Sequence, residues 1–179
     1  MRELIIGGAR SGKSSLALKR ASASERDVTY VATATASDAE MQTRIVRHRA
    51  ERPAHWRTIE ASTQLAACLQ ALDRPDAFII VDCLTLWLAT VLCAANTLQA
   101  EFDVPSWQRE RNDFLQCLPT LRADIVLVSN EVGWGIVPDN AVARRFRDAQ
   151  GRLNQLVVEH CERVTLVAAG LPLTLKAAN

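Results

Sequence analysis

Residues 7–14 read Gly-Gly-Ala-Arg-Ser-Gly-Lys-Ser and match the pattern G-x-x-x-x-G-K-[S/T] at every fixed position. They follow the largely apolar run Glu3–Ile6 and open a segment of helical composition. Glycines let the backbone turn tightly, so that successive N–H groups point at phosphate oxygens, and the N-terminus of the following helix adds partial positive charge. A glycine turn that binds nothing is the alternative. The motif and its context together favour a P-loop that binds a nucleoside triphosphate.

A P-loop gives each polar residue a chemical role. Lys13 is expected to reach the β and γ phosphates and to act in catalysis, and the Ser14 hydroxyl to hold Mg²⁺. The residues expected to contact the triphosphate are Gly8, Ala9, Arg10, Ser11, Gly12, Lys13, Ser14 and Ser15. An acid at the end of a neighbouring strand completes such a metal site, and Asp82 follows the apolar run Phe78–Val81. Asp82 is therefore the second predicted magnesium residue, and a helix N-cap before Leu84 is the other role open to it.

Short β-rich runs alternate with longer helical segments along the chain. The predicted strands are Glu3–Ile6, Val28–Ala32, Arg57–Glu60, Phe78–Val81, Ile125–Ser129 and Val164–Ala168. The predicted helices span residues 13–23, 38–51, 63–72, 84–96, 106–122 and 139–161. This alternation is typical of βαβ units, and nearly continuous apolar strands are typical of a sheet covered on both faces. We expect one α/β domain over residues 1–179, a RecA-like P-loop NTPase whose mostly parallel sheet is flanked by helices.

The composition restricts the class of partner and the compartment. The formal net charge is +1, which does not favour a nucleic-acid partner. The five cysteines are scattered and form no Cys-x-x-Cys pair, as expected for reduced thiols in the cytoplasm rather than for disulfides or a zinc site. The longest apolar stretch, Phe78–Ala95, contains Asp82 and two threonines, so we expect no membrane span.

Two common classes of P-loop protein fit poorly. Ser129-Asn130-Glu131 follows an apolar strand but lacks the lysine and the aspartate of the guanine-specific N-K-x-D motif, which disfavours a G-protein switch. A nucleoside-monophosphate kinase is disfavoured because the chain has no arginine-rich lid insertion.

A basic helix with one histidine is predicted after Ser37-Asp38-Ala39-Glu40, which has the form of a capping box, and Pro53 bounds its far end. Met41, Ile45 and His48 share one face of this helix. Four arginines surround the histidine: Arg44, Arg47, Arg49 and Arg52. Nearby cations favour neutral imidazole, which is a nucleophile, and arginines bind triphosphates through several hydrogen bonds. From the spacing alone, a solvated basic helix with a half-buried histidine is the alternative.

Further segments recur in a specific order and spacing. They are Tyr30–Thr33, Asp38–Met41, Arg44-Ile45, His48-Arg49, Arg52–Thr58, Glu60, Ser129–Gly133, Gly135–Pro138, Asn140, Arg144, Phe146–Asp148, Gly151-Arg152 and Asn154-Gln155. With these segments and the P-loop, nearly the whole chain resembles the bifunctional adenosylcobinamide kinase / adenosylcobinamide-phosphate guanylyltransferase family of cobalamin (vitamin B12) biosynthesis.

The resemblance implies two reactions in one domain. The first is phosphorylation of a hydroxyl of adenosylcobinamide, and the second is transfer of GMP from GTP to that phosphate through a guanylylated histidine. It implies that His48 carries the GMP, with Arg47 in a slot where some members have a first histidine and His55 as the nearest rival. It also implies a homotrimer, for which the apolar segment Leu84–Ala95 is the independent support in the sequence. The implied nucleotide contacts outside the P-loop are Ala34, Thr35, Ala36, Glu51, Arg52, Pro53, Ala54, Glu60 and Asp82, the last often a glutamate in the family.

Two other functions remain open at this point. A monofunctional small-molecule kinase would turn over nucleotide without a covalent adduct, and a non-catalytic nucleotide sensor would bind without turnover. Lys13, Ser14 and His48 are all present, which disfavours the sensor. ATP and GTP both remain candidates for the phosphate donor, and Asp82 and Glu131 both remain candidates for the base that accepts the substrate's proton.

Overall fold

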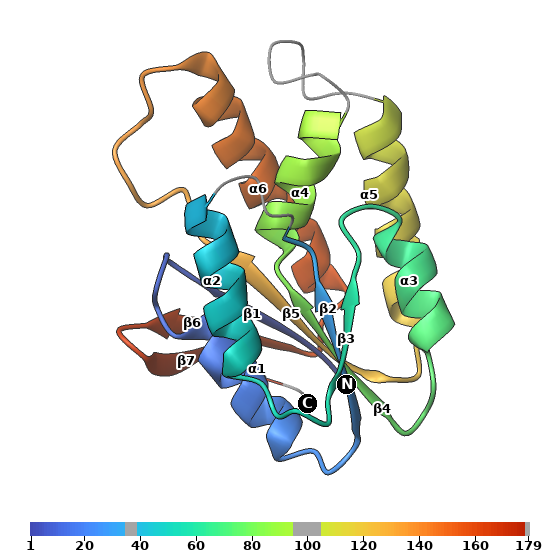
Figure 1. The fold of residues 1–179 in the computed structure, drawn as a ribbon. Helices are drawn as coiled ribbons and strands as arrows, with labels where there is room; N and C mark the ends of the chain where they lie inside the picture. Colours follow the sequence, from blue (N-terminus) through green and yellow to red (C-terminus); the bar gives the residue numbers. More distant parts are fainter. Residues whose placement is uncertain (35–38, 95–104, 178–179) are drawn as a thin grey trace.

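A seven-stranded sheet in the order β3-β2-β4-β5-β1-β6-β7 forms the centre of the computed structural model (Figure 1). The structure describes residues 1–34, 39–94 and 105–177. The strands are β1 (Arg2–Gly7), β2 (Asp27–Ala32), β3 (Arg57–Glu60), β4 (Ala77–Asp82), β5 (Asp124–Asn130), β6 (Arg163–Ala168) and β7 (Leu171–Lys176). The helices are α1 (Lys13–Ser22), α2 (Ala39–Ala50), α3 (Leu65–Leu72), α4 (Leu84–Ala94), α5 (Pro105–Cys117), the short 3-10 helix η1 (Leu118–Thr120) and α6 (Ala141–Glu159).

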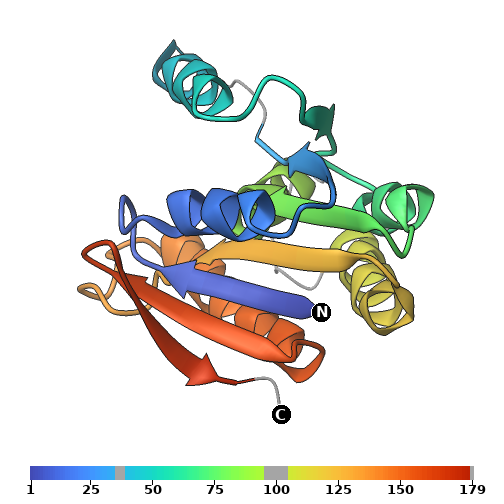
Figure 2. The same ribbon diagram turned by 90° about the horizontal axis from the view of Figure 1, so that it is seen from below.

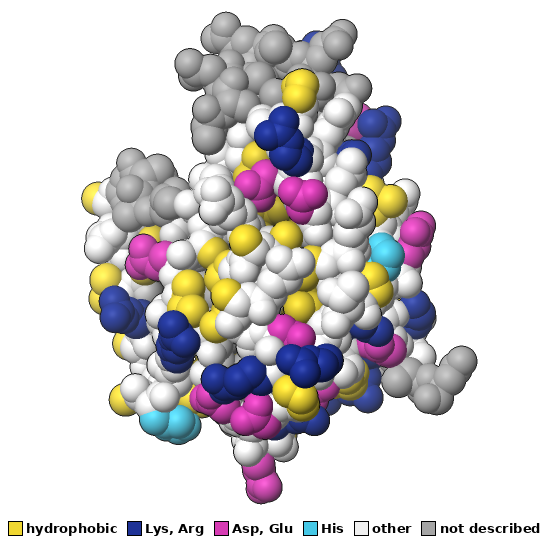
Figure 3. Space-filling model, turned by 90° about the vertical axis from the view of Figure 1, so that its right-hand side faces the viewer, with side chains coloured by type: hydrophobic (Ala, Val, Ile, Leu, Met, Phe, Trp, Pro, Cys, Tyr) yellow, Lys and Arg dark blue, Asp and Glu magenta, His cyan; other side chains and the backbone are white. Residues whose placement is uncertain are grey.

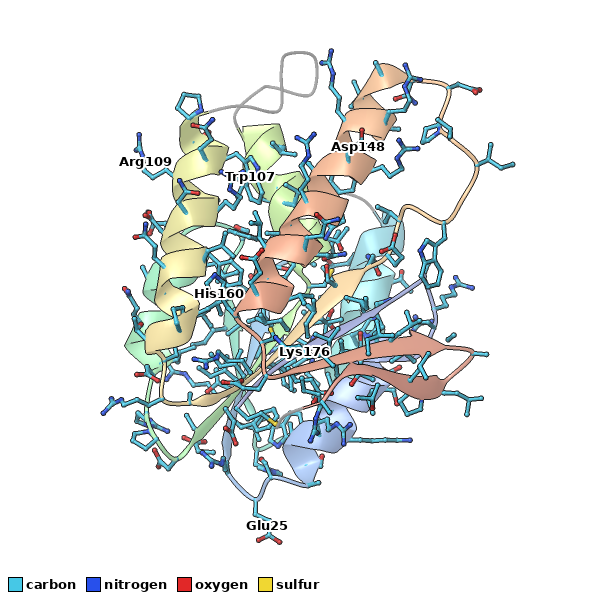
Figure 4. The ribbon with its side chains drawn as sticks, turned by 180° about the vertical axis from the view of Figure 1, so that it is seen from behind. Glu25, Trp107, Arg109, Asp148, His160 and Lys176 are labelled. Carbon is cyan, nitrogen blue, oxygen red and sulfur yellow. The ribbon has the colours of Figure 1, made fainter. Side chains whose placement is uncertain are left out.

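The strand side chains alternate between two apolar cores. In β4, Phe78 and Ile80 belong to the core that contains α1, whereas Ile79 and Val81 belong to the core formed with α3, α4, α5 and α6. Helix α1 therefore covers one face of the sheet, in front in Figure 1, and α5 and α6 cover the other face, which Figure 4 shows from behind. The pairings of β1 to β6 are all parallel. The predicted mostly parallel sheet with both faces covered is confirmed.

The predicted helices all form, and their ends show which local signals act. Helix α6 begins after Asn140, whose side chain accepts a hydrogen bond from the Ala143 amide at 2.7 Å. The prediction of one helix over residues 106–122 is wrong at its far end, because α5 ends at Cys117 and η1 follows. Pro119 lies in η1 and has no amide hydrogen to continue the α-helical ladder.

Strand β7 is missing from the sequence prediction, yet it pairs antiparallel with β6. Ala169 and Gly170 join the two strands with φ angles of 50° and 79°, as a tight hairpin turn requires. All of β7 is exposed, so it lacks the buried apolar pattern that marks the other strands, and Pro172 suits its edge position. Lys176, at its end, donates from Nζ to the Val158 carbonyl at 3.1 Å, near the end of α6 (Figure 4).

The apolar segment that begins at Leu84 is buried within the chain itself. Trp87 of α4 has none of its surface exposed. Its ring packs edge-on against Trp107 and Phe114 of α5, with centroid separations of 5.2 and 5.0 Å. The apolarity of α4 is explained by packing inside one chain, so it no longer serves as support for a subunit interface.

The carboxyl ends of the parallel strands meet at one edge of the sheet, where ligands of open α/β sheets bind. Gly7 at the end of β1 pairs with Asn130 of β5, and Ala32 of β2 pairs with Asp82 of β4. The P-loop and Asp82 thus share this edge. Strand β5 lies between β1 and β4, so Asp82 comes from the second strand along rather than from the immediate neighbour that the sequence analysis expects.

Charges of both signs are interspersed over the described part of the face that carries α3 and α5 (Figure 3). Arg122 pairs with Asp73 at 3.1 Å, and Arg74 pairs with Asp27. This face presents opposite charges side by side, in keeping with the net charge of +1.

Trp87→Ala should lower the free energy of unfolding by about 3–5 kcal/mol, because it leaves a cavity between α4 and α5. Urea denaturation measures the change. Trp134→Ala is the matched control, since Trp134 is 74% exposed, and it should change the stability by less than about 0.5 kcal/mol. Equal losses in the two variants would contradict this description of the core.

Candidate nucleotide-binding site

Two glycines of the P-loop allow close backbone packing that no other residue permits. A Cβ on Gly7 would overlap the carbonyl oxygen of Val167 in β6. Gly12 has φ of 101°, and a Cβ there would lie 3.3 Å from the Cα of Gly170. Two backbone hydrogen bonds fix the loop further: Gly170 N–H to the Ser11 carbonyl at 2.8 Å, and Glu131 N–H to the Gly7 carbonyl at 3.0 Å. The β6–β7 turn and the segment after β5 therefore hold the P-loop in place.

Lys13 is folded into the loop at the start of α1 and is 7% exposed. Its Nζ donates to the Gly8 carbonyl at 2.6 Å and lies 3.5 Å from Ser11 Oγ. Burial lowers the pKa of Lys13 by disfavouring its charge, while Cys83 and Asp82 act in the opposite direction. A phosphate group beside this ammonium would stabilise the charge that burial disfavours.

Asp82 at the end of β4 is held by a tyrosine that the sequence analysis did not select. The Tyr30 hydroxyl donates to Asp82 Oδ2 at 2.7 Å. The pKa of Tyr30 is raised, mainly by burial and then by Asp82, so the phenol keeps its proton and acts as a donor. Tyr30 appears in the sequence only as one residue of an apolar strand. The pairing becomes visible once β2 and β4 are known to be neighbours.

The alternative role of Asp82 as an N-cap is not what the structure shows. Helix α4 begins at Leu84, and Cys83 is the residue directly before it. Thr33 fixes this junction: its Oγ1 accepts from the Cys83 amide at 2.8 Å and donates to the Cys83 carbonyl at 2.7 Å. Burial, with Asp82 adding to it, raises the pKa of Cys83 to about 12, so this thiol stays neutral and is not a nucleophile.

A buried polar network fixes the end of β5 next to the P-loop. Ser129 Oγ donates to Asn154 Oδ1 at 2.7 Å and accepts from Gln150 Nε2 at 2.9 Å. Asn154 Nδ2 in turn donates to the Asn130 carbonyl at 3.1 Å. Because Asn130 pairs with Gly7, this network supports the loop from beneath.

The residues predicted to bind Mg²⁺ offer oxygen donors of the kind that this hard cation prefers. They are the hydroxyl of Ser14 and the carboxylate of Asp82. Within the described ranges, no group of three or more His, Cys, Asp or Glu side chains could hold a metal ion by itself. The donor set therefore fits a magnesium ion that takes its remaining ligands from nucleotide phosphates and water.

His48 lies in α2 and is 36% exposed. Its Nδ1 is 3.6 Å from Glu51 Oε2, and Arg47 Nε is 3.9 Å from Glu51 Oε1. The neighbour of the imidazole ring is thus a carboxylate as well as the predicted arginines. No hydrogen bond or ion pair among the described residues joins His48 to the P-loop.

The prediction that α2 packs an inward apolar face is wrong for the residues that can be assessed. Ile45 is only half-buried, Val46 is exposed, and no α2 side chain in the described part of the chain belongs to either apolar core. Figure 2 shows α2 standing apart from the sheet. The predicted capping residues Ser37 and Asp38 lie outside the described residues.

Arg52 follows α2 and stacks on the sheet instead of pointing at the P-loop. Its Cζ lies 3.4 Å from the centroid of the Tyr30 ring. Glu51 and Pro53 line a groove of about 590 Å³ along α1, together with Ser15. The structure thus brings three predicted nucleotide contacts together beside α1, one turn away from the P-loop glycines.

The remaining predicted contacts are spread over the same edge. Ala34 follows β2, and Glu60 is the exposed last residue of β3, paired with Ala32. Thr35 and Ala36 lie outside the described residues. His55 is exposed, lies beyond the end of α2 and packs its ring against Trp56 at a centroid distance of 6.5 Å.

Comparison with solved structures identifies the fold. The chain is similar to a prototypical ATPase from the type III secretion system of pathogenic bacteria, with a TM-score of 0.58 and 12% identity over 97% of this chain and 57% of that chain. It is also similar to the RadB recombinase, with a TM-score of 0.51 and 15% identity over 92% of this chain and 73% of that chain. At these identities the likeness shows the P-loop NTPase fold alone.

Comparison of sequences is more specific. The chain is 48% identical to the bifunctional adenosylcobalamin biosynthesis protein CobP of Pseudomonas aeruginosa, over 98% of both chains. It is 40% identical to the bifunctional adenosylcobalamin biosynthesis protein CobU of Salmonella typhimurium, over 97% of this chain and 98% of that protein. The model of the cobinamide kinase / cobinamide phosphate guanyltransferase family matches residues 3–175. The chain with this P-loop, Asp82 and His48 therefore belongs to the cobinamide kinase / cobinamide phosphate guanyltransferase family.

Proposed function

We propose that this protein phosphorylates adenosylcobinamide and then transfers GMP from GTP to the new phosphate, forming adenosylcobinamide-GDP in cobalamin biosynthesis. Residues 1–179 act as one transferase domain for both steps. The observation that carries the proposal is the buried Lys13, which shares the carboxyl edge of the sheet with Asp82, in a chain 48% identical to a bifunctional relative over nearly its full length.

The kinase step takes place at the P-loop, with ATP or GTP as the phosphate donor. Backbone N–H groups and Lys13 hold the triphosphate, while Ser14 and Asp82 hold Mg²⁺, which neutralises charge on the phosphates. The hydroxyl oxygen of the substrate forms a bond to the γ-phosphorus. The bond between that phosphorus and the β,γ-bridging oxygen breaks, and the nucleoside diphosphate leaves.

The guanylyl transfer uses His48 as a carrier in two displacements. An imidazole nitrogen forms a bond to the α-phosphorus of GTP, and pyrophosphate leaves with the bridging oxygen. A phosphate oxygen of cobinamide phosphate then displaces the imidazole. Glu51 faces Nδ1, so it orients the ring and leaves Nε2 as the attacking nitrogen.

The first displacement requires Nε2 of His48 to come within bonding distance of the α-phosphorus. Helix α2 stands apart from the sheet (Figure 2), so guanylylation includes an approach of α2 to a nucleotide seated in the P-loop. Such closure steps are common in enzymes that must exclude water before a transfer reaction.

The assembly and compartment are part of the same proposal. We expect a homotrimer on the basis of the family resemblance, and a corrinoid substrate rather than a nucleic acid. The cysteines Cys68, Cys83, Cys117 and Cys161 are free thiols, which supports a reducing cytoplasm. Within the described residues, no helix is long and apolar enough to cross a membrane.

Lys13→Ala should lower both the kinase and the guanylylation rates by at least about 100-fold, because both steps need the triphosphate held in the loop. Steady-state assays with saturating nucleotide and Mg²⁺ measure the two rates. Lys176→Ala, which removes an exposed lysine at the end of β7, is the control and should keep both. Near wild-type rates in Lys13→Ala would overturn the role of the P-loop.

Asp82→Asn should raise the Mg²⁺ concentration needed for nucleotide binding several-fold while unfolding stays cooperative, because the amide is a weaker ligand for a hard cation. Titration of Mg²⁺ against a fluorescent GTP analogue measures the shift. An unchanged Mg²⁺ dependence would show that Asp82 does not serve the metal.

His48→Asn should abolish the covalent guanylyl adduct and the transfer step together, while phosphorylation of cobinamide continues because the P-loop is untouched. GTP labelled at the α-phosphate, followed by a denaturing gel, detects the adduct. The label should stay on the protein in base and leave in acid, as expected for a phosphoramidate. His55→Asn is the matched control and should still be labelled. Labelling of His48→Asn but not of His55→Asn would place the carrier outside α2.

A further inference from the structure

Tyr30 contacts two groups that the proposed function assigns to different steps. Its hydroxyl donates to Asp82 Oδ2 at 2.7 Å, and the guanidinium of Arg52 lies over its ring, with Cζ 3.4 Å from the centroid. Tyr30 is itself 3% exposed, so it is a fixed part of the sheet rather than a mobile surface group. Asp82 belongs to the proposed metal site, whereas Arg52 follows the helix that carries His48.

The sheet places the phenol under the carboxylate. Tyr30 of β2 is the register partner of Ile80 in β4, and Asp82 lies two residues further along β4. Residues two apart on a strand point to the same face, so Asp82 and the Tyr30 ring lie on the α1 side of the sheet, with Ile80. The hydrogen bond uses Oδ2, one of the two oxygens, and restricts the rotation of the carboxylate.

Arg52 is the point at which the chain leaving α2 meets the sheet. Its amide donates to the Arg49 carbonyl at 3.3 Å, which closes the last turn after α2. Its Nη1 lies 3.4 Å from Thr58 Oγ1, and its Nε is buried without a hydrogen-bond partner among the described residues. A planar guanidinium over an aromatic face is attracted by the ring electrons, a geometry that lysine does not reproduce.

Because no described α2 side chain enters either apolar core, the Arg52 stack is a principal tie between the end of this helix and the sheet. The ring fixes where α2 ends and therefore the arc through which His48 can approach the nucleotide. A displacement of the nucleophile by about 1 Å is enough to lower the rate of a transfer step strongly.

We propose that Tyr30 is a positioning residue that couples the metal-binding carboxylate to the helix carrying the guanylylated histidine. The hydroxyl serves Asp82, and the ring serves Arg52. The proposal rests on the roles proposed above for Asp82 and His48, and the two contacts can be removed separately.

Tyr30→Phe keeps the ring and removes the hydroxyl. The Mg²⁺ concentration for half-maximal binding of a fluorescent GTP analogue should rise by roughly threefold to tenfold. At saturating Mg²⁺ the rate of His48 labelling from α-labelled GTP should return to the wild-type value. This binding measurement does not depend on turnover.

Arg52→Gln removes the stack and keeps the hydroxyl. The labelling rate should fall by about tenfold to 100-fold, while the Mg²⁺ dependence of nucleotide binding stays as in the wild type. Thr58→Ala, which removes only the weaker contact of Arg52, is the matched control and should leave both readouts unchanged.

A double-variant cycle separates positioning from direct contact of Arg52 with GTP. Tyr30→Leu should reduce the labelling rate at saturating Mg²⁺ as much as Arg52→Gln does, and the two changes combined should cost no more than either alone. Additive losses would mean that Arg52 acts on the nucleotide and not through Tyr30.

Thermal unfolding of each variant shows which of them fold. If Tyr30→Leu does not fold, the opposite responses of Tyr30→Phe and Arg52→Gln still carry the test. Equal effects of these two variants on both readouts, or no effect of either, would overturn the coupling. Failure of the wild-type protein to be labelled at all would instead refute the proposed guanylyl transfer, while the Mg²⁺ shift in Tyr30→Phe would still report on the hydroxyl.

Discussion

Close backbone packing between the P-loop and the β6–β7 turn is the constraint on which the site depends. A side chain at Gly7 would overlap the Val167 carbonyl, and Gly12 adopts a left-handed conformation against Gly170. This packing fixes the loop, and the loop in turn buries Lys13 beside Asp82 and Cys83. Strand β7, although fully exposed, is therefore functional scaffolding, because its hairpin turn supplies one wall of the phosphate cradle.

The sequence predicts those features that depend on local chemistry. The P-loop, the strands covered on both faces and the Asn140-initiated helix all follow from glycine geometry, apolar runs or capping, and the structure agrees. Features that depend on partners far away in the chain are missed. Strand β7 has no buried face to reveal it, and Tyr30 acquires a role only because β2 and β4 are adjacent.

Two expectations about helices illustrate the same limit. The helical-face argument groups Met41, Ile45 and His48 correctly as a geometric pattern, but the face does not reveal whether a core is present to receive it. Helix α2 stands apart from the sheet. The apolar composition of α4 indicates burial, and the partner turns out to be α5 of the same chain rather than another subunit.

Two chemistries can share this edge because they use different phosphorus atoms of a nucleotide held by one loop. Lys13 and Asp82 belong to the fixed sheet, whereas His48 belongs to a helix with few ties to it. A fixed charge site suits a phosphate clamp, and a loosely tied nucleophile suits a carrier that must first reach the α-phosphorus and then present GMP to a bulky acceptor. The Tyr30 contacts with Asp82 and Arg52 connect the two parts.

The most direct test is the time course of products from the purified chain given adenosylcobinamide, ATP, GTP and Mg²⁺, followed by liquid chromatography with mass detection. The account predicts that adenosylcobinamide phosphate appears first and then declines as adenosylcobinamide-GDP and pyrophosphate accumulate in equal amounts. Accumulation of the phosphate with no adenosylcobinamide-GDP would contradict the bifunctional account and leave a kinase. Absence of both products would contradict it entirely.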